Sequence, residues 1–376
     1  MSAPKTTLTV TRSMPRVLVC AGGGGVGKTT TSAALALALA RRKKKTLVVT
    51  VDPARRLADA IGVPIGTTVR KARVDARANG YLYALMPDPQ GAVRGFIEFL
   101  FAGEDAARAR VFANPLYGIL EGAIAGVHEL MSVMLVARAV DEQAFDHVVI
   151  DTAPSRHALD LVTYPGRLAA LLEGRAMGWI GGLAQRATSG KSTGGGVLSW
   201  GKRRVEDALA KAIGARLIGD IAQIFADLAI VRVRVSQVAR EAEQILFGEA
   251  TRFALVAAPT GAARADVLYL ARRLEKFGRR PSALVLNRAD LTELGFARAL
   301  RSDANLSAPM RAALAQLEVE RMARTAAGDA LAAELARRFP DLPLVRLPAV
   351  NDRSSAEIVK SLASELDASL AALGLE

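Results

Sequence analysis

Cysteine and histidine are scarce in this chain. Its 376 residues include one cysteine, Cys20, and three histidines that do not cluster in the sequence. A lone cysteine excludes a disulfide within the chain, and a zinc site needs several Cys or His ligands at short spacings. We therefore expect a protein of a reducing compartment, and we expect no zinc.

Long uninterrupted hydrophobic runs are also missing. Residues 1–16 lack the apolar core of a signal peptide, and residues 1–14 are expected to be a disordered tail. The most apolar long stretch, residues 115–136, contains Glu121, His128 and Glu129, which argue against a membrane span. The sequence predicts a soluble, cytoplasmic protein and leaves peripheral membrane association open.

Acidic residues are fewer than basic ones, 37 against 50, and the formal net charge is +13. Such a charge suits an anionic partner. The only dense basic run, residues 41–45, follows a predicted helix, and cations are favourable at the carboxyl end of a helix. We therefore expect no specific nucleic-acid partner.

Glycine is concentrated in one segment, RVLVCAGGGGVGKTTT at residues 16–31. An apolar run precedes the glycines and an alanine-rich helical pattern follows them, and the spacing G-x4-G-K-T is that of a Walker A phosphate loop. Lys28 is placed to reach the β and γ phosphates, and the Thr29 hydroxyl to ligate Mg²⁺. A glycine turn that binds no nucleotide is the alternative, which the flanking strand and helix disfavour. The predicted nucleotide-binding residues are Gly22, Gly23, Gly24, Gly25, Val26, Gly27, Lys28, Thr29 and Thr30.

Predicted strands alternate with predicted helices along the chain, which indicates an α/β fold with a mostly parallel sheet covered by helices on both faces. We expect residues 15–376 to form a single P-loop ATPase domain. Two helical insertions, at about 90–140 and 160–250, carry no strand pattern and are expected to form a helical subdomain. The predicted strands cover 17–19, 46–52, 81–88, 147–154, 252–259, 282–290 and 342–350, and the predicted helices 29–42, 53–62, 264–278, 308–338 and 354–373.

Two carboxylates, Asp52 and Asp151, end predicted strands. Ligands of open parallel sheets bind at the carboxyl ends of the strands, so both should face the phosphate loop. Asp151 follows four apolar residues, as the Walker B acid does, and would hold Mg²⁺ through water. Asp52 could orient the attacking water or accept its proton. Each aspartate could instead cap the following helix.

Three segments together resemble one family. GGVGKTT (24–30), VDPARRLADAIG (51–62) and DTAPSRHALDL (151–161) look like the arsenite-pump and tail-anchored-protein-targeting ATPases, which are relatives of the MinD and ParA ATPases. VLNR (285–288) and LPLVRLPAV (342–350) follow in the expected order. The resemblance implies a dimeric switch protein that couples Mg-ATP hydrolysis to binding of a hydrophobic protein segment or a membrane-protein partner.

The resemblance also implies roles for particular residues. Asp52, with Pro53, Arg55 and Arg56, would form switch I, in which Asp52 activates water. Asp151 would begin switch II, together with Thr152, Pro154 and His157. Asn287 would contact adenine, and the loop around Pro348 would close over the base. Without the resemblance, Asn287 could equally be a turn residue.

The chain departs from this family at the phosphate loop. Gly23 stands where the family carries a lysine that reaches the partner subunit's nucleotide. Opposing the charge on the transferring phosphate is a large catalytic effect, so we predict slow hydrolysis unless Arg55 or Arg56 supplies a cation. The CxxC cysteines that bind zinc and the thiols that bind arsenite are also missing. A single phosphate loop predicts a homodimer, or a heterodimer with a paralogue that retains the lysine.

The helical insertions are candidates for a client-binding surface. The residues singled out are Leu130, Met131, Met134, Met177, Trp179 and Trp200. Ordinary core packing is the alternative for the first of these segments, and the second flanks an expected flexible loop at 188–196. An ATPase subunit that energises an anion or metalloid transporter, and a hydrolysis-impaired nucleotide-binding scaffold, are the alternative functions.

Overall fold

The computed structural model describes residues 16–51, 56–66, 68–86, 89–118, 136, 145–152, 215–289, 306–350 and 354–375. The chain divides into two compact units. The first consists of Met1–Met86, Val136–Leu159 and Leu246–Glu376, and the second of Pro87–Leu135 and Asp160–Ile245.

The first unit is built on an eight-stranded sheet with the order β3-β4-β2-β5-β1-β6-β7-β8. All neighbouring strands are parallel except β3 and β4. The predicted α/β class with a mostly parallel sheet is therefore confirmed. The strands are β1 (Arg16–Gly22), β2 (Thr46–Thr50), β3 (Arg70–Lys71), β4 (Leu82–Leu85), β5 (His147–Asp151), β6 (Thr251–Ala257), β7 (Ala283–Leu286) and β8 (Leu344–Arg346).

The central strands are buried along nearly their whole length. Every residue of β2, β5 and β7 is buried, and β1 and β6 each have one exposed residue, near their amino ends. Helices cover both faces of a parallel sheet, so its strands read as continuous apolar runs rather than alternating patterns. This is why the sequence revealed these strands.

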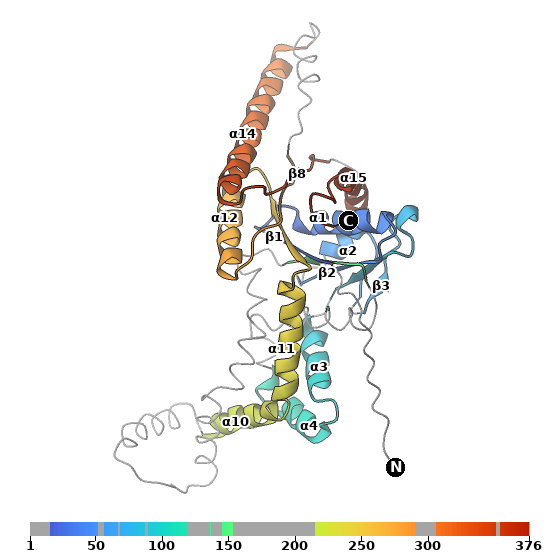
Figure 1. The fold of residues 1–376 in the computed structure, drawn as a ribbon, viewed down its shortest axis with the longest axis vertical. Helices are drawn as coiled ribbons and strands as arrows, with labels where there is room; N and C mark the ends of the chain where they lie inside the picture. The colour runs from blue at the N-terminus through green and yellow to red at the C-terminus, as the bar shows by residue number, and fades with distance from the viewer. Residues whose placement is uncertain are drawn as a thin grey trace, which may run out of the picture. The chain divides into compact units, whose positions relative to one another are not determined.

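Helices cover both faces of this sheet (Figure 1). On one face, α1 (Lys28–Arg41) packs against β1, β2 and β5, and α15 (Ser355–Asp367) and α2 (Arg56–Ile61) pack on α1. On the other face, α12 (Gly261–Lys276) packs on β1 and β6 and also contacts α14 (Ala308–Arg338). Right-handed crossovers require this division, because the chain moves from β1 toward β2 in one direction and from β6 to β7 in the other.

Helix α1 is almost entirely buried. Residues 34–40 alternate alanine and leucine, and each residue of 33–40 is at most 1% exposed. Alanine side chains let the helix lie close to the sheet on one side and to α15 on the other. The same helix carries the phosphate loop at its amino end, so this packing holds the loop on a rigid support.

The basic run at the end of α1 is used within the first unit. Arg41 donates to Asp75 beside the short 3₁₀ helix η1 (Ala76–Ala78), and Arg42 pairs with Asp367. The Lys45 ammonium lies over the Phe145 ring, 5.0 Å from its centroid. These contacts agree with the interpretation of the run as structural cations.

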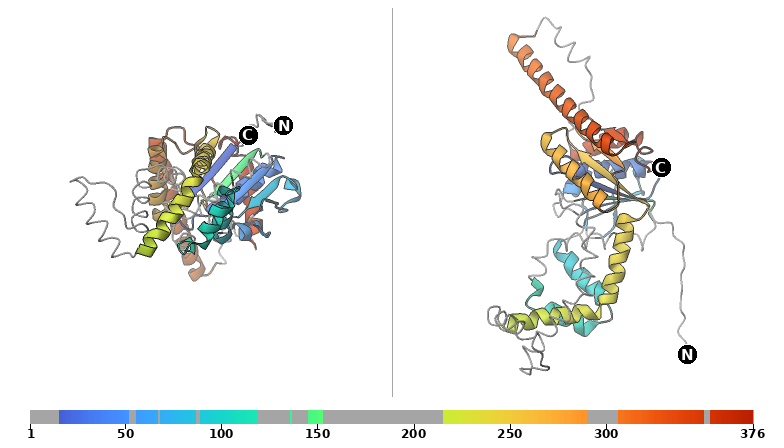
Figure 2. Two further views of the ribbon diagram at one scale, coloured as in Figure 1. Left: turned by 90° about the horizontal axis from the view of Figure 1, so that it is seen from below. Right: turned by 60° about the vertical axis from the view of Figure 1, so that its left-hand side comes forward.

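The second unit is helical in its described residues. Its helices are α3 (Pro89–Leu100), α4 (Asp105–Ala113), α10 (Ala215–Ile230) and α11 (Arg232–Phe247), of which the last continues into the first unit (Figure 2). A core of Leu100, Phe101, Ala107, Val111, Val231 and Val235 joins α3 and α4 to α11. The Asp227 carboxylate is buried and is paired with Arg110, so α10 and α4 are also joined by charge.

The sequence patterns missed β3 and overestimated the length of several strands. β3 is a two-residue exposed edge strand, so it carries no hydrophobic signal. The strands β4, β7 and β8 are shorter than the predicted strands 81–88, 282–290 and 342–350, and residues 287–289 and 347–350 follow β7 and β8 outside the strands. The predicted helix at 308–338 coincides with α14. No helix in the described part of the chain is long and apolar enough to cross a membrane.

Candidate functional site

The phosphate loop joins β1 to α1 at the carboxyl edge of the sheet. Gly25 and Gly27 have positive φ angles, 71° and 88°, which glycine adopts without the strain that a Cβ causes. Gly27 is the N-cap of α1, and no side chain caps the helix there. The first N–H groups of a helix have no partner within it and carry the positive end of its dipole. This geometry suits a bound phosphate.

Lys28 lies within this loop. Its residue is 5% exposed, and its Nζ donates to the Gly23 carbonyl oxygen at 2.6 Å. The ammonium therefore turns back across the loop from the first turn of α1. A lysine held in this way can exchange a loop carbonyl for phosphate oxygens without crossing open solvent.

Thr29 and Asp151 are brought into direct contact. The Thr29 hydroxyl donates to Asp151 Oδ2 at 2.8 Å, and Asp151 is fully buried at the end of β5. A hydroxyl and a carboxylate are oxygen ligands of the kind that Mg²⁺ takes, usually with phosphate oxygens and waters completing its shell. The described residues contain no group of three or more His, Cys, Asp or Glu that could hold a metal by themselves. The donor set thus fits a magnesium ion that arrives with a phosphate chain.

Thr50 is a third member of this cluster, and the sequence reasoning missed it. Its hydroxyl donates to the same Asp151 Oδ2 at 3.1 Å, and Thr50 lies opposite Asp151 in the register of β2 and β5. The sequence feature that could have identified Thr50 is its polar side chain at the end of an apolar strand, two positions before Asp52. That signal becomes informative only when β2 is known to neighbour β5.

Thr152 connects the end of β5 to β1. Its hydroxyl donates to the Cys20 carbonyl at 2.8 Å, and the residue is buried. Burial raises the pKa of the Cys20 thiol to about 12, which disfavours the reactive thiolate form.

Asn287 and Pro348 follow β7 and β8 at the same edge of the sheet. The Asn287 Nδ2 donates to the Val26 carbonyl of the phosphate loop at 2.9 Å. Pro348 follows Leu347, whose backbone N–H donates to the Leu286 carbonyl at 2.9 Å. The structure thus brings both predicted residues to the loop edge, and it shows a loop contact of Asn287 that the sequence did not reveal.

Gly23 lies against α12. A Cβ built on Gly23 would overlap the carboxylate of Asp266, which projects from the second turn of that helix. At the position that carries a lysine in the family resemblance, a side chain would therefore displace the Asp266 carboxylate and would have an acidic neighbour. Sequence reasoning missed Asp266, because nothing in its surroundings marks it as a residue of the phosphate-loop region.

Several predicted residues lie outside the described part of the chain. Arg56 is described and is the exposed first residue of α2. Five predicted switch residues lie outside the described part: Asp52, Pro53, Arg55, Pro154 and His157. The predicted client-surface residues also lie outside it: Leu130, Met131, Met134, Met177, Trp179 and Trp200. The predicted flexible loop at 188–196 and the tail at 1–14 are outside it as well.

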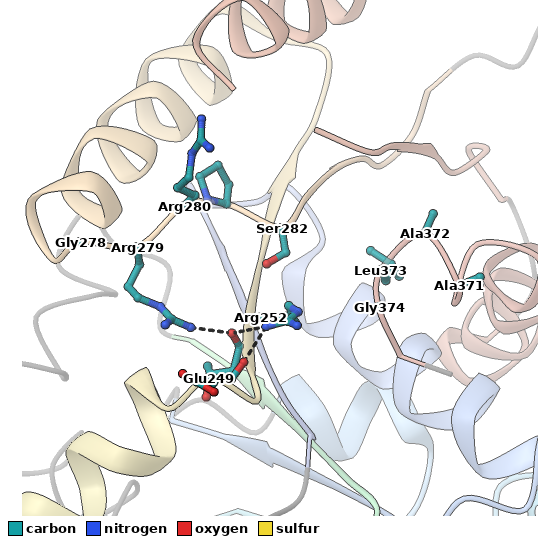
Figure 3. A pocket seen from close by; sticks show the side chains of 12 residues that line it. Glu249, Arg252, Gly278, Arg279, Arg280, Ser282, Ala371, Ala372, Leu373 and Gly374 are labelled. Atoms are coloured by element: carbon teal, nitrogen blue, oxygen red, sulfur yellow. Dashed lines mark hydrogen bonds between the residues drawn. The ribbon is translucent and has the colours of Figure 1, made fainter. Parts of the chain in front are cut away.

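A hollow of about 480 Å³ lies at the opposite, amino edge of β6 and β7 (Figure 3). Two of the arginines that line it donate to backbone carbonyls: Arg279 to those of Gly248 and Thr251 at 3.1 and 2.8 Å, and Arg252 to that of Glu249 at 2.7 Å. These bonds fix the start of β6. These arginines therefore have a structural role in the sheet, and we do not assign a binding site to this hollow.

Comparison with known proteins agrees with the site. The sequence profile of the anion-transporting ATPase family matches residues 15–253, more than half of the chain. ATPase get3 of Aspergillus terreus is 35% identical over 119 residues, which are 32% of this chain and 34% of that protein. ATPase GET3 of Rhodotorula glutinis is 33% identical over 142 residues, 37% of this chain and 36% of that protein. ATPase get3 of Schizosaccharomyces pombe is 33% identical over 143 residues, 37% of this chain and 39% of that protein.

The chain thus spans little more than a third of the length of these curated relatives. The family profile is the broader match, since it runs from β1 to the first residues of β6 and includes the phosphate loop, Asp151 and the second unit. On that match, the chain belongs to the anion-transporting ATPase family.

Proposed function

We propose that this protein binds Mg-ATP at the phosphate loop and hydrolyses it. The observation that carries the proposal is the Thr29–Asp151 contact, which puts an oxygen ligand set for Mg²⁺ beside Lys28 and the open amino end of α1. Membership of the anion-transporting ATPase family supports it.

Each residue of the site then has a defined part. The N–H groups at the start of α1 and the Lys28 ammonium bind the phosphate chain, and Thr29 with Asp151 holds the magnesium ion. When bound, the ion neutralises charge on the β and γ phosphates. Thr50 holds Asp151 in place through its hydroxyl. Asp52 orients the attacking water, a role supported by the family resemblance.

Hydrolysis is proposed to be slow. Gly23 supplies no charge to a partner's nucleotide, and the neighbouring Asp266 is acidic. Stabilising the charge on the transferring phosphoryl group is worth factors of about 10³–10⁵ in related phosphoryl-transfer enzymes. Arg55, Arg56 or a lysine-bearing paralogue could provide the missing cation.

We further propose that the protein is a dimeric switch that captures and releases a hydrophobic protein segment or a membrane-protein partner. The helical second unit supports this proposal, because it is a compact unit separate from the nucleotide-binding sheet and can carry the client surface. The family's description as anion-transporting favours a second candidate, an ATPase subunit that energises an anion transporter.

Steady-state phosphate release tests the enzymatic proposal. Wild-type protein with Mg-ATP should release phosphate, and Lys28→Ala and Asp52→Asn should release it at least about tenfold more slowly, since both act at the transferring phosphate. Equal rates in all three proteins would refute hydrolysis at this site.

Two further assays separate the candidate roles. Gel filtration with ADP and with a non-hydrolysable ATP analogue should show a nucleotide-dependent change of oligomer. Protection of an aggregation-prone transmembrane peptide by protein and ATP would support the client-binding role. Without such protection, the transporter subunit is the better candidate.

A further inference from the structure

Asn287 is buried beneath the phosphate loop. The residue is 4% exposed and follows β7 directly, with its backbone N–H donating to the Ala257 carbonyl of β6 at 2.8 Å. Its carboxamide Nδ2 donates to the Val26 carbonyl at 2.9 Å. The side chain thus connects the rigid sheet to the loop from a position 261 residues away in the sequence.

The same carboxamide also packs against the next residue of the loop. A Cβ built on Gly27 would overlap Asn287 Nδ2, and Gly27 has a φ of 88°. Glycine is therefore required at this position by the backbone angle and by the volume of Asn287. Val26 and Gly27 are held by one side chain that belongs to a different strand.

The bond fixes the direction of one peptide group. In a trans peptide the N–H points opposite to the C=O. With the Val26 carbonyl directed at Asn287, the Gly27 N–H points away from β7. An N–H held in this way is preorganised to donate to a phosphate oxygen, because it needs no reorientation when the ligand arrives.

We propose that Asn287 is a positioning residue of the phosphate loop, which sets the Val26–Gly27 peptide for phosphate binding whatever base the nucleotide carries. This inference rests on the proposed nucleotide-binding function. It differs from the adenine contact that the family resemblance implies, since an adenine contact affects only ligands with that base. The carboxamide has a second N–H and an oxygen, so the two roles are compatible.

A ligand without a base separates the two roles. Titration calorimetry compares Mg-ATP with Mg-tripolyphosphate on wild-type protein, Asn287→Ala and the control Asn114→Ala. Asn114 is another buried asparagine whose amide donates to a backbone carbonyl, that of Asp220, in the second unit.

We expect Asn287→Ala to weaken the binding of tripolyphosphate and of ATP alike, by about tenfold or more, since the Gly27 N–H is no longer held in the direction of the phosphate. The control should bind both ligands as the wild type does. Weakened ATP binding with unchanged tripolyphosphate binding would overturn the inference and leave only a base contact. If wild-type protein bound neither ligand, the proposed function would fail, and the inference with it.

A double-mutant cycle with Gly27→Ala provides a second measurement. In the wild-type background the new Cβ meets Asn287, whereas in the Asn287→Ala background only the backbone strain remains. We expect Gly27→Ala to weaken tripolyphosphate at least about threefold more in the first background than in the second, and an additive cycle would overturn the inference. Asn287→Ser, which is too short to reach Val26, replaces the alanine variant if circular dichroism shows that the latter is unfolded.

Discussion

The carboxylate of Asp266 occupies the space that a side chain on Gly23 would need. Gly23 follows β1 directly and Asp266 lies in the second turn of α12, so two distant parts of the sequence meet at the phosphate loop. Gly23, where the family resemblance places a lysine, therefore has an acidic neighbour. In the single variant Gly23→Lys, the new side chain would overlap the Asp266 carboxylate, and that carboxylate would offset the charge of the new ammonium.

This relationship predicts how Gly23→Lys will behave. The single variant should turn over ATP no faster than wild type, because the new ammonium pairs with Asp266 instead of reaching a partner's nucleotide. Gly23→Lys combined with Asp266→Ala should be at least about tenfold faster, since a charge that opposes the transferring phosphate is worth ~10³-fold or more. Single-turnover phosphate release measures both. Equal rates for the single and the double variant would contradict this account.

Replacing Thr50 is predicted to change the Mg²⁺ dependence of ATP binding. In Thr50→Val the Asp151 carboxylate loses one of its hydroxyl donors while the volume of the side chain is kept. The Mg²⁺ concentration for half-maximal ATP binding should rise by about tenfold, as expected for loss of a group that orients a metal ligand. The matched control is Thr46→Val in the same buried strand, whose hydroxyl donates to the Lys44 carbonyl at 3.0 Å, away from the site. A similar rise in both variants would show a general effect on β2.

Arg41 and Arg42, although neighbours in the sequence, are expected to contribute unequally to the free energy of unfolding. Arg41 donates to Asp75 through Nε at 2.9 Å and to the Lys360 carbonyl at 3.1 Å, and both side chains of the pair are nearly buried. Arg41→Ala should lower the free energy of unfolding by about 2–4 kcal/mol, because the largely buried Asp75 carboxylate loses its close ion pair and keeps only the Arg77 backbone N–H at 2.8 Å and the Arg77 guanidinium at 3.7 Å. Arg42 pairs with Asp367 in solvent, so Arg42→Ala should cost less than about 1 kcal/mol. Urea denaturation compares them, and equal losses would contradict this ranking.

The buried His147 is expected to make the free energy of unfolding depend on pH. Burial, with a smaller contribution from the nearby Arg16 charge, lowers the pKa of His147 to about 4, although Asp146 opposes the shift. In the unfolded chain the pKa of a histidine is about 6.5, so below that pH the unfolded state binds a proton that the folded state does not. This residue should therefore destabilise the fold progressively from about pH 6.5 to pH 4, by up to ~3 kcal/mol.

The measurement compares wild-type protein with His147→Gln by urea denaturation at pH 7.5 and pH 5. The wild type should lose more free energy of unfolding between these pH values than the variant, which cannot bind the proton. Parallel losses would show that other groups dominate in this range.

The sequence revealed most of the sheet and of the phosphate loop, for an identifiable physical reason. Buried parallel strands read as apolar runs, and the Walker spacing puts a glycine at position 27, where the φ angle is positive. The contact between Thr29 and Asp151 was also accessible, because the strand-end rule brings separate carboxylates to one edge.

The rest depended on neighbours that the sequence does not specify. Thr50 acts on Asp151 only because β2 pairs with β5, and Asp266 reaches Gly23 only because α12 crosses the face of the sheet beside β1. Asn287 was assigned to adenine by resemblance, yet its visible bond is to the loop backbone, a contact that depends on the turn after β7. Such contacts follow from tertiary packing and leave no local pattern.

We propose that Thr29, Asp151 and Lys28 form one site for Mg-ATP. The most direct test of this proposal is the affinity for ATP, measured by titration calorimetry with and without Mg²⁺, for wild-type protein, Asp151→Asn and Lys28→Ala. Wild-type protein should bind ATP at least about tenfold more tightly with Mg²⁺, as expected for a metal held by a carboxylate and phosphates. Asp151→Asn should lose that difference, and Lys28→Ala should bind weakly under both conditions. Wild-type affinity that is independent of Mg²⁺ and equal to that of both variants would contradict the account.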